Sequence, residues 1–446
     1  MLTQDQYYID IKGKNICSEP KAKEHIVNPY TTMTDVLDSN LLKNGTLSNT
    51  VEQEEETSPI DSQTQENYRK WKANSIQLYD YLNTVNSIWP SWTVQFFPDR
   101  EINRNKRPIY RLLTGTYTSG QMDEYVQLGN FTVKDDIELV DLNKYDHDSQ
   151  EFNSSDPIVG KFQNIQKFLH RGEINKLRYL PQNPNLISSI NDKGHVHIFD
   201  KTKLPSLPVD DFRFEMSLQY HKDEGFGLNW NNNKEGVLLT SSMDGTTATW
   251  DITKFSKSAP VITTPIHAYK TDEKGTNDCQ WNPLHDSIFA TVGEDNNVKI
   301  FDERKQGNEL IRSNNKLHSG GINALSFNNH NSFALSTADS DGKLNIWDLR
   351  AIASPIFEIT SAHQGSISSV KFNPNKPELL ATAGSDDSIV NIWNLSREPK
   401  DQLVFKHAGH MLGVNEVAWN PNDYRMISSV SNDNTVHIWK PSKQFI

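Results

Sequence analysis

A unit of about fifty residues recurs along the chain, and this repeat constrains the possible fold more than any other feature. Each unit ends on an aromatic residue followed by a polar one, and successive pairs are 51, 51, 46, 46 and 46 residues apart. The pairs are Phe199-Asp200, Trp250-Asp251, Phe301-Asp302, Trp347-Asp348, Trp393-Asn394 and Trp439-Lys440. Repetition at this period indicates that one supersecondary unit is stacked several times, because a single unit cannot bury its apolar face alone.

Within each unit, apolar and polar residues alternate, which predicts short β-strands. The segments INALSF (322–327), SFALSTA (332–338) and KLNIWDL (343–349) are separated by turn-forming stretches such as NNHN and DSDG. Alternation with frequent turn signals is typical of all-β proteins. Three such strands, with a fourth in each connection, make up the four-stranded blade of a WD-repeat β-propeller. The fold is therefore predicted to be all-β.

A seventh blade is predicted before the first clear repeat. Six units cover residues 170–440, and a propeller of this type usually has seven blades. The segments WTVQFFP (92–98), YRLLTGTY (110–117) and EYVQLGNFTV (124–133) all have the pattern of strands. WTVQFFP is expected to pair with the last blade, so that the two ends of the propeller close the ring and leave no free sheet edge.

Each unit also opens with a histidine, and in most units an aspartate precedes the closing aromatic residue by six positions. The histidines are His170, His221, His267, His318, His363 and His410. The aspartates are Asp244, Asp295, Asp341, Asp387 and Asp433, and the closing tryptophans are Trp250, Trp347, Trp393 and Trp439. Because these residues recur with the repeat and fall in different blades, they are interpreted as hydrogen-bond networks that brace the blades. Metal ligation and acid catalysis are not expected of them.

Negative charge is concentrated in two segments of a chain whose formal net charge is −12. Residues 1–65 carry 11 acidic and 5 basic residues without hydrophobic periodicity, and they are predicted to be a disordered acidic N-terminal segment. An acidic insertion at about 135–160 has 8 acidic residues and 1 basic residue between positions 135 and 156. It is interpreted either as a screen for the charge of a basic partner or as a solubilising loop. The overall charge disfavours direct binding of nucleic acid.

Residues 66–90, ENYRKWKANSIQLYDYLNTVNSIWP, are predicted to form an amphipathic helix of about five turns that ends at Pro90. The apolar positions at helical spacing are Tyr68, Trp71, Leu78, Leu82 and Val85. The helix is too polar to span a membrane. It is expected to pack on the side of a propeller that covers residues 91–441 and is followed by a short tail, 442–446. Its outer flank either braces the propeller or forms one wall of a groove for a partner helix.

Several strings resemble one family of WD-repeat proteins. They are YRKWKANSIQLYDYLNTVNSIWPSWTVQFFPD (68–99), HRGEINKLRYLPQNP (170–184), HKDEGFGLNWN (221–231), HAGHMLGVNEVAWNPND (407–423) and NDNTVHIWKP (432–441). They are similar to the retinoblastoma-binding, MSI-type histone chaperones, and YLNTVNSIWPSWTVQFFPD and HMLGVNE look most like the fungal small subunit of chromatin assembly factor. The resemblance covers about residues 66–440, which is most of the chain.

The resemblance implies two histone-binding sites. The first is a groove for a helix of histone H4, with matching positions at Leu78, Tyr81, Leu82, Leu403 and Phe405. The second is the top face around the central channel, which in the family takes the basic tail of histone H3. Matching positions there are Glu173, Asn175, Glu224, Phe226 and Asn323. Carboxylates at these positions suit such a tail because they form charge-assisted hydrogen bonds with Arg and Lys.

The implied function is a histone H3–H4 binding subunit that acts in replication-coupled nucleosome assembly, with larger subunits of a chromatin assembly or histone-modifying complex as partners. One alternative is the accessory subunit of the type B histone acetyltransferase. Another is a generic WD-repeat scaffold, such as a ubiquitin-ligase substrate receptor or a signalling adaptor. No phosphate-binding loop, nucleophile elbow or metal-ligand spacing predicts an enzyme or a cofactor. The chain has only two cysteines, which favours a reducing compartment. The resemblance implies the nucleus as the location, with the cytoplasm as a second one.

Overall fold

The computed structural model describes residues 62–102, 104, 107–133, 145–146, 151–152, 162–209, 212–254, 260–305, 311–313 and 317–446. Residues Ser58–Ile446 form one compact unit. The predicted disordered segment, 1–65, lies outside the described residues except for its last four positions. The acidic insertion also lies outside them, apart from two short strands, β6 (Tyr145–Asp146) and β7 (Glu151–Phe152), which pair antiparallel.

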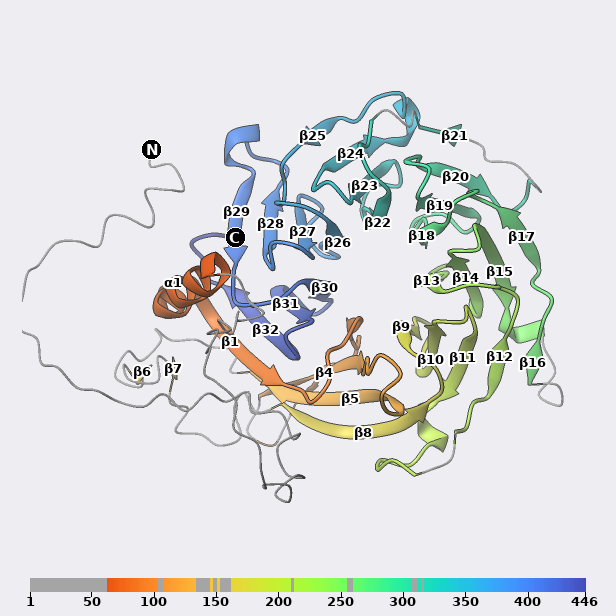
Figure 1. Cartoon of the computed structure of the whole chain (residues 1–446), viewed down its shortest axis with the longest axis horizontal. Helices are drawn as coiled ribbons and strands as arrows, with labels where there is room; N and C mark the ends of the chain where they lie inside the picture. Colours follow the sequence, from red (N-terminus) through yellow and green to blue (C-terminus); the bar gives the residue numbers. More distant parts are fainter. Residues whose placement is uncertain are drawn as a thin grey trace, which may run out of the picture. The chain divides into compact units, whose positions relative to one another are not determined.

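The described strands form a seven-bladed β-propeller in which the sheets follow one another around a common centre (Figure 1). From inner to outer strand, the first blade consists of β2 (Val94–Phe96), β4 (Pro108–Gly115), β5 (Glu124–Thr132) and β8 (Gln163–His170). The second blade consists of β9 (Ile174–Leu180), β10 (Asn183–Asn191), β11 (Val196–Asp200) and β12 (Met216–Leu218). The third blade consists of β13 (Gly225–Trp230), β14 (Val237–Ser242), β15 (Thr246–Asp251) and β17 (His267–Lys270). Two short strands extend these sheets, because β3 (Glu101–Ile102) pairs with β4 and β16 (Val261–Ile262) runs parallel to β12.

The remaining four blades repeat the same order. The fourth blade consists of β18 (Thr276–Trp281), β19 (Ile288–Gly293), β20 (Lys299–Asp302) and β21 (Ile311–Arg312), and the fifth of β22 (Ile322–Phe327), β23 (Ala334–Asp339), β24 (Leu344–Asp348) and β25 (Phe357–Ile359). The sixth consists of β26 (Ile367–Phe372), β27 (Leu379–Gly384), β28 (Val390–Asn394) and β29 (Leu403–His407). The seventh consists of β30 (Val414–Asn420), β31 (Asp423–Ser431), β32 (Thr435–Pro441) and β1 (Tyr79–Asn86). The all-β propeller with an N-terminal helix, predicted from the repeat, is confirmed.

The ring is closed by a different segment from the one predicted. WTVQFFP was expected to join the last blade, but its central residues form β2, the inner strand of the first blade, which pairs with β4. The outer strand of the last blade is instead β1, which pairs antiparallel with β32 from Tyr79 opposite Pro441 to Asn86 opposite Thr435. The last blade has three strands of its own, β30, β31 and β32, so its outer edge is free, and a segment that precedes the first unit covers it.

The N-terminal helix is shorter than predicted. It covers Ser62–Leu78 (α1), and the chain becomes strand β1 at Tyr79, well before Pro90. The expectation of one helix over 66–90 was wrong because the apolar positions after Leu78 fit a strand as well as a helix. Tyr81 and Val85 face the first blade, and Leu82 faces the opposite side, as alternation along a strand requires. Hydrogen bonds to the free edge of β32 stabilise the strand conformation of this segment over the helical one.

Large aromatic side chains fill the spaces between neighbouring blades. Trp250, Trp281, Trp347 and Trp439 are among the largest side chains that are completely buried. Each belongs to an apolar cluster that joins strands of adjacent sheets, as Trp347 does with β19 and β20 of the fourth blade and β22 of the fifth. Burial of a large side chain stabilises a fold by roughly 1.5–3 kcal/mol, so these contacts hold the blades in a rigid ring.

Candidate functional site

The recurring histidines and tryptophans meet at a shared hydroxyl inside the blades. In the third blade, His221 Nε2 lies 2.8 Å from Thr240 Oγ1, and Trp250 Nε1 donates to the same oxygen at 3.0 Å. The fifth, sixth and seventh blades repeat this arrangement around Thr337, Thr382 and Ser429. These side chains are buried and paired with one another, so they brace the fold and are not displayed to a ligand.

The aspartates join the networks less regularly than the sequence suggested. Asp387 lies 3.0 Å from His363 Nδ1, which fits the prediction. In the fifth blade, however, the carboxylate beside His318 is that of Asp339, at 2.9 Å. The predicted Asp341 only donates its backbone N–H to Asp339. Its assignment to the network was wrong because the six-residue spacing does not separate a turn aspartate from the one at the end of the strand.

His267 is not part of any such network. It lies half-buried on the outer strand β17, where it pairs with Thr249. In the other networks, the histidine precedes the shared hydroxyl residue by 19 positions. In the fourth blade, the residue 19 positions before Thr291 is Asp272 and not a histidine. There Lys299 Nζ lies 2.5 Å from Asp295 and 3.8 Å from Asp272. A buried ion pair thus replaces the histidine, and the prediction for His267 was wrong.

An apolar cluster lies between α1, β1 and β29, where the histone H4 groove was predicted. Leu78 and Leu82 pack against it, and Phe405 belongs to its buried part. Tyr81 does not, because it points to the other face of β1 and stacks on Phe131 of the first blade. Leu403 packs into the cluster between the fifth and sixth blades. The structure therefore brings together three of the five predicted residues and places Tyr81 and Leu403 elsewhere.

The chain after β32 folds over this same cluster. The Phe445 ring packs edge-on against the Phe405 ring, with 5.4 Å between their centroids, and Ile446 also contacts the cluster. Backbone and side-chain bonds hold the segment: Ser442 N–H donates to Leu78 O at 2.9 Å, and Arg397 donates to Phe445 O. The tail, predicted only as residues 442–446, thus covers part of the proposed groove.

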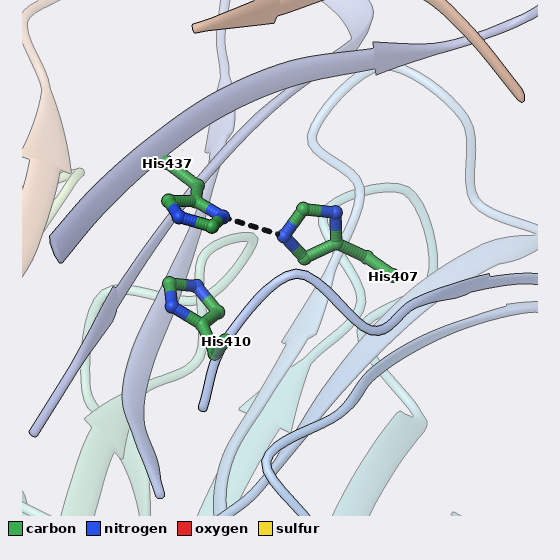
Figure 2. Close-up of side chains that lie close together, drawn as sticks. All are labelled: His407, His410 and His437. Carbon is green, nitrogen blue, oxygen red and sulfur yellow. Dashed lines mark hydrogen bonds between the residues drawn. The ribbon is translucent and has the colours of Figure 1, made fainter. Parts of the chain in front are cut away.

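A buried chain of hydrogen bonds ties α1 to the last blade. Trp71 Nε1 donates to Tyr79 Oη at 2.7 Å, and the same hydroxyl is hydrogen-bonded to His407 Nδ1, also at 2.7 Å. His407 Nε2 is in turn hydrogen-bonded to His437 Nδ1 at 2.9 Å, the bond drawn in Figure 2. Burial lowers the pKa of His407 and of His437 well below the usual value, so both rings are neutral.

His407, His410 and His437 offer ring nitrogens within 4.8 Å of one another, which raises the question of a metal site. Figure 2 shows the rings of His410 and His437 stacked, and their centroids are 4.0 Å apart with 19° between the planes. Stacked rings direct their lone pairs side by side, not toward one point. Both nitrogens of His407 and of His410 already have hydrogen-bond partners. The arrangement suits a structural network better than a cation. The sequence reasoning overlooked His407 and His437, which lie outside the repeat positions.

On the top rim, acidic and aromatic side chains from three blades lie together. The Trp92 ring stacks on Tyr117 at 4.1 Å between centroids and faces Phe226 at 6.5 Å. The pKa of the Glu224 carboxyl is raised by partial burial first, then by the neighbouring Asp223 and by Glu173. The acids of the rim therefore lie close enough to repel one another. A bound cation would relieve this repulsion between acids. Trp92 and Tyr117 were not predicted for this face.

The two predicted asparagines of this face have bonds within the ring. Asn175 is buried and donates from Nδ2 to Gly225 O of the next blade at 3.0 Å. Asn323 Nδ2 donates in the same way to Ile367 O at 3.1 Å and to Ser366 Oγ at 2.9 Å. Their amide hydrogens therefore join adjacent blades, and the acceptor oxygens are what remain for a ligand.

Below the rim, a cavity of about 310 Å³ opens into the channel. Its lining residues come from every blade except the first, together with the segment before β2, and are Trp92, Asn175, Lys176, Phe226, Asn277, Asp278, Asn323, Ala324, Ser366, Ser368, Ser369, Lys371, Asn415 and Glu416. The predicted Asn175, Phe226 and Asn323 thus share one hollow, whereas Glu173 lies at a second hollow of about 210 Å³ beside Glu124 and Asp192.

Comparison with known proteins agrees with the fold and with the resemblance seen in the sequence. Residues 66–133 match a family model that describes the histone-binding protein RBBP4 and its counterpart in the CAF1 complex. Residues 401–440 match the WD domain, G-beta repeat, and residues 254–393 match the EIPR1 beta-propeller. The chain is 37% identical over 418 residues to "Histone-binding protein MSI1" of Saccharomyces cerevisiae, which covers 88% of this chain and 97% of that protein.

This chain belongs to the RBBP4/MSI1 family of WD-repeat proteins. The match at residues 66–133 includes α1 from Glu66 onward, β1 and the strands β2, β4 and β5. A chain of a solved structure titled "Crystal Structure of Mitotic Checkpoint Complex" is also similar, with a TM-score of 0.57 and 14% identity over 80% of this chain and 94% of that one. That likeness shows the propeller fold alone.

In the part of the chain that the structure describes, the helical segments are too short or too polar to cross a membrane.

Proposed function

We propose that this protein binds histones H3 and H4 as the small subunit of a chromatin assembly factor, that it acts in the nucleus and that it has no enzymatic activity of its own. The observation that carries the proposal is the 37% identity to a histone-binding protein over 97% of that protein's length. The family model that matches the N-terminal part of the chain names the CAF1 complex, which favours this role over the acetyltransferase accessory subunit and over a generic scaffold.

The side of the propeller supports a site for an amphipathic helix of histone H4. Leu78, Leu82 and Phe405 gather in one apolar cluster beside α1, and only Phe405 among them is fully buried. An amphipathic helix binds such a surface through apolar residues at helical spacing. Anchoring of α1 by the Trp71–Tyr79–His407 bonds would keep the groove wall in place without a partner.

The top rim supports a site for the basic tail of histone H3. Glu173 and Glu224 supply carboxylates, and Phe226 with Trp92 supplies aromatic faces on which an aliphatic or cationic stem can lie. Asn175 and Asn323 would accept hydrogen bonds through the oxygens left over from their contacts between blades. This site and the H4 groove lie on different elements, so they can be tested separately.

A pull-down with purified H3–H4 tests the proposal. Leu82→Asp should lose most of the histone, because a charge is placed on the apolar groove. The matched control is Thr84→Asp, which puts the same charge on an exposed position of the same strand. If the wild-type protein retains no histone in moderate salt, or if Leu82→Asp retains as much as Thr84→Asp, the groove assignment fails.

Binding of an H3 tail peptide tests the rim. Glu224→Gln should weaken it about tenfold, as loss of one charge-assisted hydrogen bond of roughly 1.5 kcal/mol would. Glu235→Gln is the control, because Glu235 is exposed at the opposite end of strand β13. Mass spectrometry of co-purifying subunits then separates the assembly factor from the acetyltransferase.

A further inference from the structure

Two polar side chains on β26 face the channel cavity without hydrogen-bond partners. Ser369 and Lys371 are alternate residues of this strand, so they project to the same side, and both line the cavity of about 310 Å³. Ser369 is only 3% exposed, and its Oγ has no hydrogen-bond partner. Among the described residues, the nearest acid to Lys371 Nζ is Glu416, at 3.9 Å, and no hydrogen bond to this ammonium is found.

The other charges around the cavity are already paired. Lys176 Nζ lies 3.0 Å from Asp278, and Arg178 binds Glu416 through both of its terminal nitrogens. Three cations therefore face two carboxylates, and the unmatched charge is that of Lys371. Because Lys371 shares Glu416 with Arg178 and has no hydrogen bond of its own, its partly buried ammonium is incompletely neutralised and is expected to attract a counter-charge from solution.

We infer that the channel cavity binds a small oxoanion, the size of inorganic phosphate, between Lys371 and Ser369. The ammonium would donate charge-assisted hydrogen bonds to two oxygens, and the Ser369 hydroxyl would donate to a third. Asn323 and Asn415 line the same cavity, but their amide N–H groups donate to the protein, so the anion would take its hydrogen bonds from Lys371 and Ser369. A cation is excluded from this position by Lys371 itself.

Glu416 does not neutralise Lys371 in place of an anion, because its carboxylate is held by other hydrogen bonds. Glu416 is the acid nearest to Lys371, and its oxygens receive bonds from Arg178, from Thr93 Oγ1 and from the backbone N–H of Val94. It cannot turn toward Lys371 without breaking these bonds. Burial lowers the pKa of Lys371 to about 8, against the effect of Glu416, so the side chain is still mostly charged at neutral pH.

The source of the oxoanion is either a free anion or an acidic side chain that a bound peptide inserts into the channel. The two have the same chemistry at Lys371, but only the first binds without a peptide. The anion site shares its cavity with Asn175, Phe226 and Asn323 of the proposed H3 site, but Lys371 and Ser369 are not among the residues proposed to bind histone. Phosphate binding is measured without histone, so a failure of the anion site and a failure of histone binding are distinguished by separate titrations.

Isothermal titration of the full chain with inorganic phosphate, at constant ionic strength in chloride, tests the inference. One equivalent should bind, and Lys371→Met should weaken binding at least about tenfold. Lys371→Met removes an ammonium that makes no hydrogen bond, and Glu416 keeps its bonds from Arg178, so the variant should fold. Ser369→Ala, which removes a single oxygen, gives an independent readout and should weaken binding about fivefold. Lys406→Met is the control, because Lys406 is exposed on β29.

The inference is overturned if phosphate does not bind to the wild-type chain and N-acetylglutamate does not bind either. It is also overturned if Lys371→Met and Ser369→Ala bind phosphate as tightly as Lys406→Met does. Tighter binding of N-acetylglutamate than of phosphate, lost in Lys371→Met, would support the same site and identify an acidic side chain as the source.

Discussion

The Glu416 carboxylate in the seventh blade accepts hydrogen bonds from Arg178 in the second blade, and so joins two blades that stand on either side of the first. The same carboxylate accepts from Thr93 Oγ1 and from Val94 N–H at 2.9 Å, where the inner strand of the first blade begins. One side chain therefore connects three consecutive blades at the point where the ring closes. The β1–β32 pairing closes the ring at its outer edge, and Glu416 does so at the inner edge.

Loss of this carboxylate should destabilise the whole ring. Burial alone would raise the pKa of Glu416, but Arg178 and Lys371 lower it to about 2, so the group is ionised at neutral pH. Glu416→Gln should lower the free energy of unfolding by about 3 kcal/mol, because Arg178 is then left buried without its partner. Urea denaturation at pH 7 measures this, with the exposed Glu398→Gln as control. A loss below about 1 kcal/mol would show that the contact is dispensable.

The histidine cluster should make stability depend on pH. Burial lowers the pKa of His437 and His407 well below the ordinary value, so the folded state binds fewer protons than the unfolded one. Their contribution to stability is therefore complete above about pH 6.5 and is lost as the pH falls from there through the lowered pKa. The melting temperature should drop between pH 6.5 and 5.5, and His437→Gln, although less stable at pH 7, should show a smaller drop.

His285→Gln is the control for this experiment, because His285 lies in a loop away from the cluster. If His437→Gln and His285→Gln follow the wild-type pH profile equally, the cluster does not determine the acid sensitivity.

Much of the fold could be predicted because the repeat carries its own pattern. The opening histidine and its hydroxyl partner recur at a constant spacing of 19 residues, as with His318 and Thr337, so one blade predicts the next. The prediction failed where the pattern ends. The stretch YDYLNTVN has apolar residues that suit either a helix or a strand, and only the free edge of β32, which no local signal reveals, selects the strand.

The candidate sites were harder to predict for the same reason. Tyr81 and Leu82 are neighbours in sequence, and once the segment is a strand they face opposite sides of β1. In the sequence, Lys371 does not differ from other polar residues of the repeat. It lacks a hydrogen-bond partner because Glu416 is bound by Arg178, which lies 193 positions before Lys371. Contacts between blades that are distant in sequence form only when the ring closes, so the spacing of residues along the chain does not predict them.

The Tyr79 hydroxyl should be essential for holding α1 against the propeller. It accepts from Trp71 Nε1 and is hydrogen-bonded to His407 Nδ1, so Tyr79→Phe leaves two buried polar atoms without these partners. The expected loss is about 1–3 kcal/mol in the free energy of unfolding. Hydrogen exchange should also be faster in α1 than in the inner strands, which locates the effect. Equal acceleration across all blades, or none, would contradict this role.

Phe445 should compete with a helix that binds to the side groove. Its ring covers Phe405, and Arg397 holds its carbonyl, so an entering helix has to displace it. If displacement costs about 1 kcal/mol of apolar contact, Phe445→Ala should tighten binding of a histone H4 helix peptide roughly fivefold. Fluorescence anisotropy with a labelled peptide measures this, and Gln444→Ala on the same segment is the control. A weaker affinity in Phe445→Ala would mean that the ring is a wall of the groove, because the peptide would then lose a contact instead of gaining access.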